Sequence, residues 1–470
     1  MVKPMENNCE LTIAGIAPLI RRKKLSPVEL TKFFLERIEQ LQPAINAYIT
    51  VTPERALAQA RIAEKQITKG HYRGVLHGIP ISLKDLFYTR GVRTTAGSRV
   101  LRNFVPAENA AIVDRLLDSG CILLGKTNMH EFAYGATNLN PHYGPVRNPW
   151  DLSRMSGGSS GGSAASVVSA QALASIGTDT GGSIRIPSAA CGCVGFKPSY
   201  GRIPLDGVIP LSTTLDHAGP LSRCVLDAAL LFDAVAQAGF WNFNPSQAVG
   251  RLRKDVKAFR IGVPREYFFD RIQPDVREAV LESVEVFKGL GARIREVNLQ
   301  GMDETAQLAA DITGAEALAF HEKGLEESAE DYGEDVRCRL EQSRAMTATA
   351  YINSLRRRLA YSRAFEQVLD SVHLLAVPTL PVTAPRLDQP EVKVGSSGED
   401  VRPALLSLTR PGNLTGLPAI SLPCGFSSDH LPIGLQLIGR RFEEATVLRA
   451  AYAYECATTW HQHFPEQEPA

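Results

Sequence analysis

The pattern of hydrophobic and polar positions changes its period several times along the first quarter of the chain. Ser26 and Pro27 form a helix start, a capping hydroxyl followed by proline, and an amphipathic helical pattern continues to Leu41. Short apolar and β-branched runs, typical of buried strands, separate the later helical stretches. The predicted helices span 26–41, 56–69 and 110–118, and the predicted strands span 81–84 and 121–124. This alternation predicts an α/β fold with helices packed against a sheet.

The rest of the chain extends this pattern. Residues 155–188 are rich in Gly and Ser, and the stretch 163–175, with Ala, Ser and Val, predicts a slim helix that packs closely on a sheet. Residues 386–402 are polar and contain Pro, Gly and Ser, so we expect an exposed loop there. Residues 417–438 hold apolar runs interrupted by Pro and Gly, and we expect these runs to rejoin the same sheet. The pattern favours one large domain over residues 1–470.

Composition and charge narrow the class of protein. Hydrophobic residues make up 44% of the chain and charged residues 21%, which is typical of a globular protein. The formal net charge of +1 gives no reason to expect direct binding of nucleic acid. The apolar run from Leu11 to Ile20 precedes basic residues instead of following them, the wrong order for a signal peptide, and no run is long enough for a membrane span. Eight dispersed cysteines indicate thiols in a reducing compartment, so we expect a cytoplasmic protein.

Two motif matches fail on physical grounds. Cys191 and Cys193 are the only close cysteine pair, but their spacing and the lack of a flanking histidine do not fit a zinc site, so we expect core thiols and no metal. Residues 120–127 satisfy the letters of a phosphate-binding loop. In such a loop a strand precedes the first glycine, whereas here residues 121–124 are themselves the predicted strand and a helix precedes Gly120. Nucleotide binding is therefore not expected.

Three segments carry chemistry when they are taken together. They are the strand that ends at Lys84, the Gly/Ser loop at 155–163, and the segment 177–187, which contains Ser183. Burial disfavours the ammonium form, so a lysine on a buried strand can act as a base. Ser183 follows two glycines, whose backbone N–H groups can surround a carbonyl oxygen without interference from side chains. A strand-end lysine or a Gly/Ser turn alone is usually structural, but the combination favours nucleophilic catalysis by serine.

These segments resemble the amidase signature family. The family's defining segment is similar to Ser-Gly-Gly-Ser-Ser-Gly-Gly-Ser at 156–163 and to Gly-Thr-Asp-Thr-Gly-Gly-Ser-Ile-Arg-Ile-Pro at 177–187, and its lysine strand is similar to Gly-Ile-Pro-Ile-Ser-Leu-Lys-Asp at 78–85. Further similar segments lie at 125–133, 148–150, 195–198, 416–421 and 434–439. The resemblance implies a single α/β/α domain with a central mixed, twisted sheet covered by helices on both faces. Its expected parts are an N-terminal helical segment at about 1–70, a signature core at about 75–225 and a variable helical pocket region at about 300–370.

Carried over to this sequence, the resemblance implies a Ser–cis-Ser–Lys triad of Lys84, Ser159 and Ser183, and the family's spacing selects Ser159 over Ser160. In the implied mechanism neutral Lys84 takes a proton from Ser159, Ser159 takes one from Ser183, and Ser183 attacks the carbonyl to form an acyl-enzyme. The relay then reverses to protonate the leaving amine, and water releases the acid. The implied chemistry requires no cofactor and no metal.

The resemblance also implies supporting roles around the triad. The Gly158–Ser159 peptide bond is expected to be cis. Asp179 and Arg185 are expected to support the loops as a buried pair that is neutral as a unit, rather than to contact substrate. The expected oxyanion hole consists of the backbone N–H groups of Thr180, Gly181, Gly182 and Ser183.

The resemblance leaves the substrate open. The family includes stand-alone hydrolases of aryl, small or aliphatic amides, esters and carbamates, and glutaminase (A) subunits of tRNA-dependent amidotransferases, whose partner brings the nucleic acid. In these glutaminases an acidic residue binds the amino group of the substrate, and Leu406 occupies that position here. We therefore predict a stand-alone hydrolase of a small-molecule amide, a monomer or homodimer, and the alternative is the glutaminase subunit. Residues 305–349 are expected to supply much of the pocket, with Met129 and Tyr134 in its wall.

Overall fold

One sheet runs through the computed structural model, which describes residues 11–237, 248–395 and 397–465. Among these residues the sheet has eleven strands in the order β1-β3-β2-β6-β8-β7-β14-β15-β11-β9-β10. In chain order its strands are β1 (Tyr48–Val51), β2 (Pro80–Lys84), β3 (Ile122–Thr127), β6 (Ala174–Asp179), β7 (Val194–Lys197), β8 (His217–Ser222), β9 (Arg260–Pro264), β10 (Arg293–Val297), β11 (Leu374–Pro378), β14 (Ala419–Phe426) and β15 (Pro432–Gly439).

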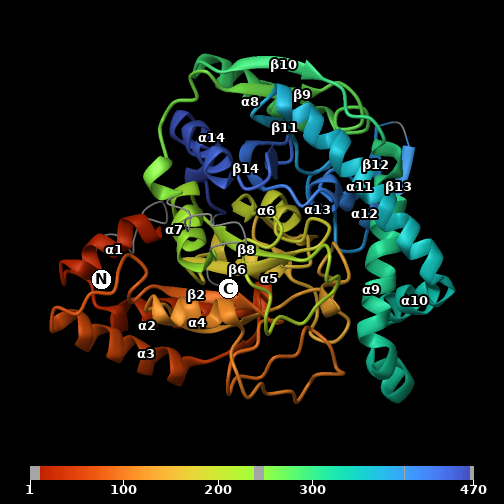
Figure 1. Cartoon of the computed structure of the whole chain (residues 1–470). Helices are drawn as coiled ribbons and strands as arrows, with labels where there is room; N and C mark the ends of the chain where they lie inside the picture. Colours follow the sequence, from red (N-terminus) through yellow and green to blue (C-terminus); the bar gives the residue numbers. More distant parts are fainter. Residues whose placement is uncertain (1–10, 238–247, 396, 466–470) are drawn as a thin grey trace.

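Helices cover the sheet, as Figure 1 shows. In chain order they are α1 (Ile13–Arg21), α2 (Pro27–Ile45), α3 (Pro53–Thr68), α4 (Ala111–Asp118), α5 (Gly161–Val168), α6 (Arg185–Cys191), α7 (Val225–Val235), α8 (Pro274–Gly289), α9 (Thr305–Ser328), α10 (Glu334–Gln342), α11 (Ala348–Ser371), α12 (Val401–Ser407), α13 (Arg410–Leu414) and α14 (Glu444–Ala457). Strand β2 pairs in parallel with β3 and β6, whereas β8, β7, β14 and β15 pair antiparallel with their neighbours. The sheet is therefore mixed, and the predicted α/β fold is confirmed.

The elements predicted near the N-terminus are present, and local interactions explain them. The Ser26 hydroxyl accepts hydrogen bonds from the backbone N–H groups of Val28 and Glu29 and so caps α2. All five residues of β2 are buried, as its apolar pattern predicts. All residues of β3 are buried as well. This strand covers residues 122–127 of the segment that matches a phosphate-binding loop, and it follows helix α4. These elements place Lys84 at the carboxyl end of an interior strand.

Two predictions further along the chain need correction. The helix expected over 163–175 ends at Val168, because strand β6 begins at Ala174 and the chain needs the intervening residues to turn onto the sheet. The exposed loop expected over 386–402 contains the two-stranded hairpin β12 (Glu391–Val394) and β13 (Ser397–Asp400), and α12 starts at Val401. The apolar runs over 417–438 do rejoin the sheet, as β14 and β15.

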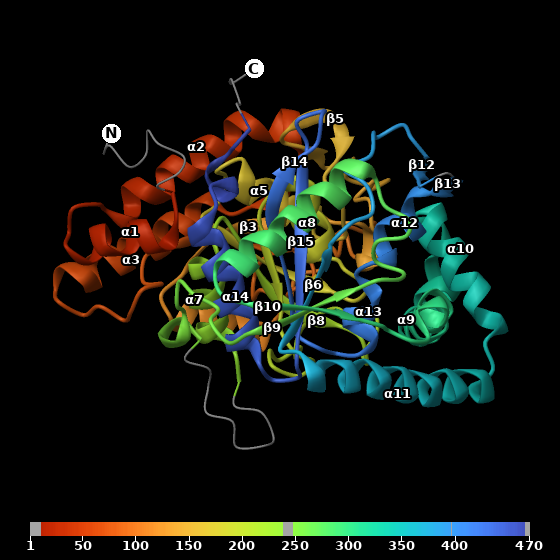
Figure 2. The same ribbon diagram turned by 90° about the horizontal axis from the view of Figure 1, so that it is seen from above.

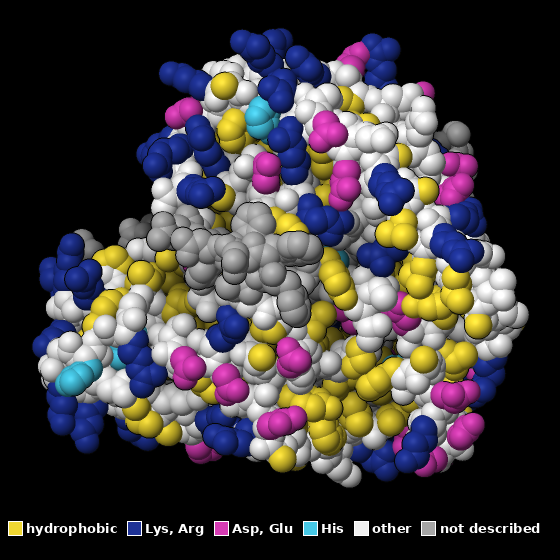
Figure 3. Space-filling view, viewed as in Figure 1, with side chains coloured by type: hydrophobic (Ala, Val, Ile, Leu, Met, Phe, Trp, Pro, Cys, Tyr) yellow, Lys and Arg dark blue, Asp and Glu magenta, His cyan; other side chains and the backbone are white. Residues whose placement is uncertain are grey.

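Two groups of helices lie at opposite sides of the sheet. Helices α1, α2 and α3 lie at one side, whereas α9, α10 and α11 lie together at the other, and both views agree on this (Figures 1 and 2). On the face drawn in Figure 3, Lys and Arg side chains are interspersed with Asp and Glu. Among the described residues, no helix combines the length and the apolar character needed to cross a bilayer.

Candidate active site

Lys84 lies at the end of β2 with its side chain fully buried. Its Nζ donates hydrogen bonds to Ser159 Oγ at 2.7 Å and to Thr178 Oγ1 at 2.8 Å. Thr178 belongs to β6, which pairs with β2 in parallel, so the carboxyl ends of the two strands meet at one edge. The sheet register therefore positions the amine of Lys84 between a strand and the Gly/Ser loop.

The surroundings of Lys84 favour its neutral form. Burial lowers the pKa of Lys84 from 10.5 to about 7, and the charges of Asp216 and Asp179 oppose this shift only in part. A substantial fraction of the amine is therefore deprotonated at neutral pH and able to accept a proton. This is the property that the sequence predicts for a strand lysine acting as a base.

The Gly/Ser loop holds two adjacent serines in different ways. The Gly158–Ser159 peptide bond is cis, as the resemblance implies, and the Ser159 carbonyl accepts the His130 N–H at 3.1 Å. Ser159 contacts Lys84, whereas the Ser160 hydroxyl donates to the Thr178 carbonyl at 3.1 Å. The structure thus gives Ser159 a basic partner and Ser160 a backbone partner.

Ser183 lies where the loop meets a cavity of about 500 Å³. Ser183, Thr180 and Gly181 line this cavity, and the Ser183 carbonyl accepts the Ser160 N–H at 3.2 Å. Gly182 has a φ of +138°, and a Cβ added there would lie 2.1 Å from Thr409 Oγ1. Only glycine fits at this position, which keeps the backbone close to Ser183 free of side chains. The geometry can therefore present Ser183 and neighbouring N–H groups to one carbonyl group.

Asp216 is a member of the site that sequence reasoning missed. The Thr180 hydroxyl donates to Asp216 Oδ1 at 2.5 Å, and the backbone N–H groups of Leu211 and Ser212 donate to Oδ2 at 2.9 and 3.1 Å. Burial raises the pKa of Asp216 to about 6, although these hydrogen bonds and Lys84 favour the carboxylate. Asp216 thus anchors Thr180 at the cavity edge. Antiparallel pairing of β6 with β8 brings it there, and no local motif marks it.

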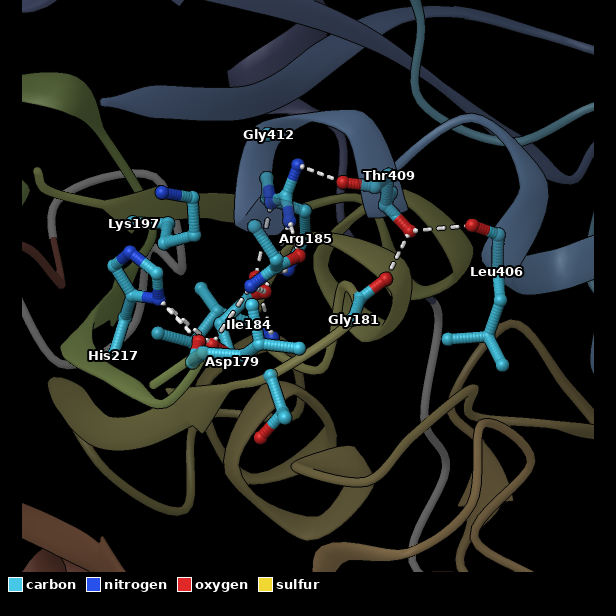
Figure 4. A network of polar contacts seen from close by, with 12 residues as sticks. Asp179, Gly181, Ile184, Arg185, Lys197, His217, Leu406, Thr409 and Gly412 are labelled. Atoms are coloured by element: carbon cyan, nitrogen blue, oxygen red, sulfur yellow. Dashed lines mark hydrogen bonds and ion pairs between the residues drawn. The ribbon is translucent and has the colours of Figure 1, made fainter. Parts of the chain in front are cut away.

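Asp179 and Arg185 form a bidentate ion pair with no exposure to solvent (Figure 4). Arg185 Nε and Nη2 donate to the two carboxylate oxygens of Asp179 at 3.0 and 2.9 Å. Burial alone would raise the pKa of Asp179, but the Arg185 guanidinium holds it well below its usual range. Neither residue lines the cavity. The pair therefore lies behind the segment that carries Ser183, in the position that a supporting role requires.

The same ion pair joins distant parts of the chain. Arg185 Nη1 donates to the Thr409 carbonyl at 2.9 Å and to Gln436 Oε1 at 2.6 Å. Asn413 Nδ2 donates to the Asp179 carbonyl at 2.9 Å and to its carboxylate at 2.8 Å. Figure 4 shows the Thr409 hydroxyl reaching the Gly181 carbonyl, at 2.6 Å. Sequence reasoning identified Asp179 and Arg185 but missed their C-terminal partners.

The cavity wall comes largely from the helical region that the sequence singled out. Residues of α9, α10 and the segment up to Ala350 line the cavity together with Tyr134 and Leu406. Met129, which was expected in this wall, does not line the cavity. Its fully buried side chain belongs to the hydrophobic core and lies near Gly97, so the expected wall position is wrong for Met129.

Three arginines in the wall were not predicted. They are Arg339, Arg402 and Arg410, and all three line the cavity. The guanidinium groups of Arg339 and Arg402 lie 5.1 and 5.7 Å from the centre of the Tyr134 ring. Arg402 lies in α12, at the end of the stretch expected to be an exposed loop, and Arg410 is the first residue of α13. Their helical placement turns them toward the cavity.

The motifs that sequence reasoning rejected are accounted for by packing. Lys126 is buried, and its Nζ donates to the Phe87 carbonyl at 2.5 Å and to Thr94 Oγ1 at 2.8 Å. Cys191 and Cys193 are buried free thiols, and burial raises the pKa of Cys193 to about 12. Within the described ranges, no group of three or more metal-ligating side chains is assembled.

Comparisons with known proteins agree with this geometry. Residues 29–448 match the sequence profile of the family described as Amidase. The A subunit of a glutamyl-tRNA(Gln) amidotransferase from Geobacter sp. (strain M21) is 40% identical over 96% of this chain and 98% of the relative. A crystal structure of an amidase has a TM-score of 0.88 at 37% identity, covering 95% of this chain and 99% of its own. A bacterial aryl acylamidase has a TM-score of 0.90 at 26% identity, covering 98% and 99%. The chain therefore belongs to the amidase signature family and is an amide-hydrolysing enzyme.

Proposed function

We propose that this enzyme hydrolyses a linear carboxylic amide through an acyl-enzyme on Ser183, with Lys84 and Ser159 as a proton relay. The observation that carries the proposal is the 2.7 Å hydrogen bond from Lys84 Nζ to Ser159 Oγ, at a lysine whose pKa burial lowers to about 7. Ser183 faces the adjoining cavity, and its backbone is bonded to the loop that carries Ser159.

The chemical steps follow from this arrangement. Neutral Lys84 accepts the proton of Ser159, and Ser159 accepts the proton of Ser183 as Ser183 Oγ attacks the substrate carbonyl carbon. When the C–N bond breaks, the relay returns a proton to the leaving nitrogen, which departs as the amine or ammonia. Water then attacks the ester of Ser183 and releases the carboxylic acid.

Backbone N–H groups supply the charge stabilisation in this proposal. The oxygen of the tetrahedral intermediate accepts hydrogen bonds from the oxyanion hole. Gly182, with its positive φ, and Thr180, which Asp216 anchors, hold this backbone at the cavity edge. The oxyanion hole consists of the N–H groups of Thr180, Gly181, Gly182 and Ser183.

A substrate panel with covalent labelling tests the proposal. The isolated chain is assayed for release of ammonia or amine from aryl amides, aliphatic amides, esters and carbamates, and is labelled with phenylmethylsulfonyl fluoride. We expect turnover of at least one amide and a sulfonyl mass adduct on the peptide that contains Ser183. An adduct on a different residue would overturn the assignment of the nucleophile.

A second candidate function is that of the glutaminase in a tRNA-dependent amidotransferase. The curated relatives at 38–40% identity are named as the A subunit of glutamyl-tRNA(Gln) amidotransferases, which supports this candidate more strongly than it supports a stand-alone hydrolase. Against it, Leu406 lines the cavity at the position where the family resemblance implies an acidic residue in the glutaminase subunits. Glutamine turnover that requires added partner subunits of an amidotransferase would establish this function. Turnover of other amides by the isolated chain, with none of glutamine under either condition, would exclude it.

A further inference from the structure

The cavity wall holds two guanidinium groups without ionic partners. Arg339 is paired, because its Nη2 donates to Asp335 Oδ2 at 2.6 Å. In the part of the chain that the structure describes, neither Arg402 nor Arg410 forms a salt bridge or donates a side-chain hydrogen bond to the protein, although both line the cavity. Arginine side chains this enclosed are normally paired, so their charge is available to an occupant of the cavity.

Arg402 and Arg410 are largely buried, so the lack of an acceptor for their guanidinium groups carries a free-energy cost. Arg410 is only 8% exposed, and Arg402 Nε is a buried donor without an acceptor. Burial, together with the nearby charges of Arg339 and Arg410, lowers the pKa of Arg402 to about 10. An anion between these groups would supply the missing acceptor and relieve the repulsion, and a carboxylate matches the planar fork of a guanidinium.

The acidic groups near the wall are already engaged. Asp311 lines the cavity and accepts hydrogen bonds from Gln307 at 2.6 Å and Ser354 at 2.7 Å. Asp335 accepts from Arg339 and pairs with His130 at 2.9 Å. Glu399, whose charge acts on Arg410, pairs with Arg271 at 2.8 Å. The wall therefore keeps an excess of positive charge, the opposite of what a substrate ammonium group requires.

Arg410 also lies close to the segment that carries Ser183. A Cβ placed on Gly181 would lie 3.9 Å from Arg410 Cγ and 3.0 Å from Leu406 Cδ2. Leu406 and Arg402 are four residues apart on α12, a spacing that brings side chains to one face of a helix. An acyl chain of a few carbons, packed on Leu406, would thus extend from Ser183 to the guanidinium groups.

We infer that Arg402 and Arg410 bind a carboxylate of the substrate, so that the enzyme acts on amides whose acyl chain ends in a carboxylate and bears no ammonium group. This inference rests on the proposed amide hydrolysis and names its substrate class. Half-amides of short dicarboxylic acids, such as succinamate and glutaramate, belong to this class. Their hydrolysis gives the dicarboxylate and ammonia.

The test compares substrates that differ only in charge. Ammonia release is measured for glutaramate, for the neutral valeramide, and for glutamine, which adds an ammonium group. We expect kcat/KM for glutaramate to exceed both others by about 10- to 100-fold, the range of a hydrogen bond to a charged group. Arg402→Gln and Arg410→Gln should each reduce the preference for glutaramate over valeramide by about 10-fold or more, mainly through a higher KM for glutaramate. Arg386→Gln, at an exposed pair with Asp388 outside the cavity, is the matched control.

A binding measurement separates this inference from the proposed function. Calorimetry with Ser183→Ala should detect glutarate binding, and Arg410→Gln in the same background should weaken it about 10-fold. Absence of glutarate binding, or faster turnover of valeramide or glutamine than of glutaramate, would overturn the inference even where amides are hydrolysed. Glutarate binding that depends on both arginines, in a protein whose Ser183 is not labelled, would instead retain the anion site and reject the proposed nucleophile.

Discussion

The two sides of the cavity satisfy their polar groups in opposite ways. On one side, which we call the catalytic floor, Lys84, Ser159 and Thr178 are fully or almost fully buried and bonded to one another. On the other, which we call the arginine wall, Arg402 and Arg410 have no ionic partner among the described residues. The floor is complete without a ligand, whereas the wall needs an occupant to satisfy its charges.

This difference suits the two sides to different tasks, catalysis on the floor and substrate recognition on the wall. Every amide passes through the same tetrahedral intermediate, so groups that act on it gain from being fixed before the substrate arrives. Groups that recognise the rest of the substrate contribute through the contacts that they complete on binding. Changes to the floor should therefore lower kcat for all substrates, and changes to the wall should change KM and substrate preference.

The largest effect is expected from Ser183→Ala. In the proposed mechanism this substitution removes the nucleophile and with it the acyl-enzyme route, and we expect kcat to fall by about 10⁴-fold or more for every substrate. Steady-state ammonia release and the loss of the sulfonyl adduct measure this. Ser175→Ala is the matched control, because Ser175 is a buried serine of β6 that donates to the Ser82 carbonyl at 3.2 Å. Equal residual activity in the two variants would show that Ser183 is not the nucleophile.

Lys84→Met should have the next largest effect and should change the pH profile. Removal of the base is expected to cost about 10²- to 10⁴-fold in kcat/KM. Because the pKa of Lys84 is about 7 and the proposed mechanism uses its neutral amine as the base, wild-type kcat/KM should rise with pH through about 7 and then level off. A rate that falls over this range, or a variant with wild-type rates at neutral pH, would mean that a different group is the base.

The same substitution alters the pH dependence of stability. Lys84 has a pKa of about 7 in the folded protein and about 10.4 in the unfolded chain, so the unfolded state binds more protons between these values. Its contribution to the free energy of unfolding therefore rises with pH across this window. Urea titrations should show a steeper rise for the wild type than for Lys84→Met. Parallel curves would contradict the lowered pKa.

Sequence reasoning reached Lys84 and Ser183 because their signals are local. A run of buried apolar residues predicts β2, and two glycines before Ser183 indicate an open backbone. The assignment of Ser159 over Ser160 came from family resemblance and not from the residues alone. The structure adds a physical difference between the two serines, since one contacts Lys84 and the other a backbone carbonyl.

The missed residues depend on contacts between distant segments. Asp216 reaches Thr180 through the pairing of β6 with β8, and Asn413 and Gln436 reach Asp179 and Arg185 across more than two hundred residues. No local pattern encodes such a contact. Arg402 was missed because residues 386–402 have the composition of a loop, and the short helix α12 has too few turns to show a clear period.

Asp179→Asn should affect stability more than substrate choice. Neutralising one partner leaves the buried Arg185 charge incompletely compensated, and we expect a loss of about 3–5 kcal/mol in the free energy of unfolding. Asp429→Asn is the control, because Asp429 is 68% exposed where it pairs with Arg154 and should contribute less than about 1 kcal/mol. Urea denaturation measures both. Similar losses in the two variants would show that the floor is not held by its buried pair.

Leu406→Asp is expected to have the smallest effect. It changes the charge of the arginine wall and leaves the residues of the catalytic floor in place. A carboxylate beside Gly181, on the helix face that carries Arg402, would offset the positive charge of the arginines and offer a partner to the ammonium group of glutamine. The preference for glutaramate over glutamine should then fall by about 10-fold, with kcat little changed. Leu406→Asn introduces a side chain with the shape of aspartate but without its charge, and this variant should keep the preference for glutaramate. Identical substrate preferences in the two variants would mean that the shape of the side chain, and not its charge, selects the substrate. The proposed electrostatic role of the arginine wall would then be wrong.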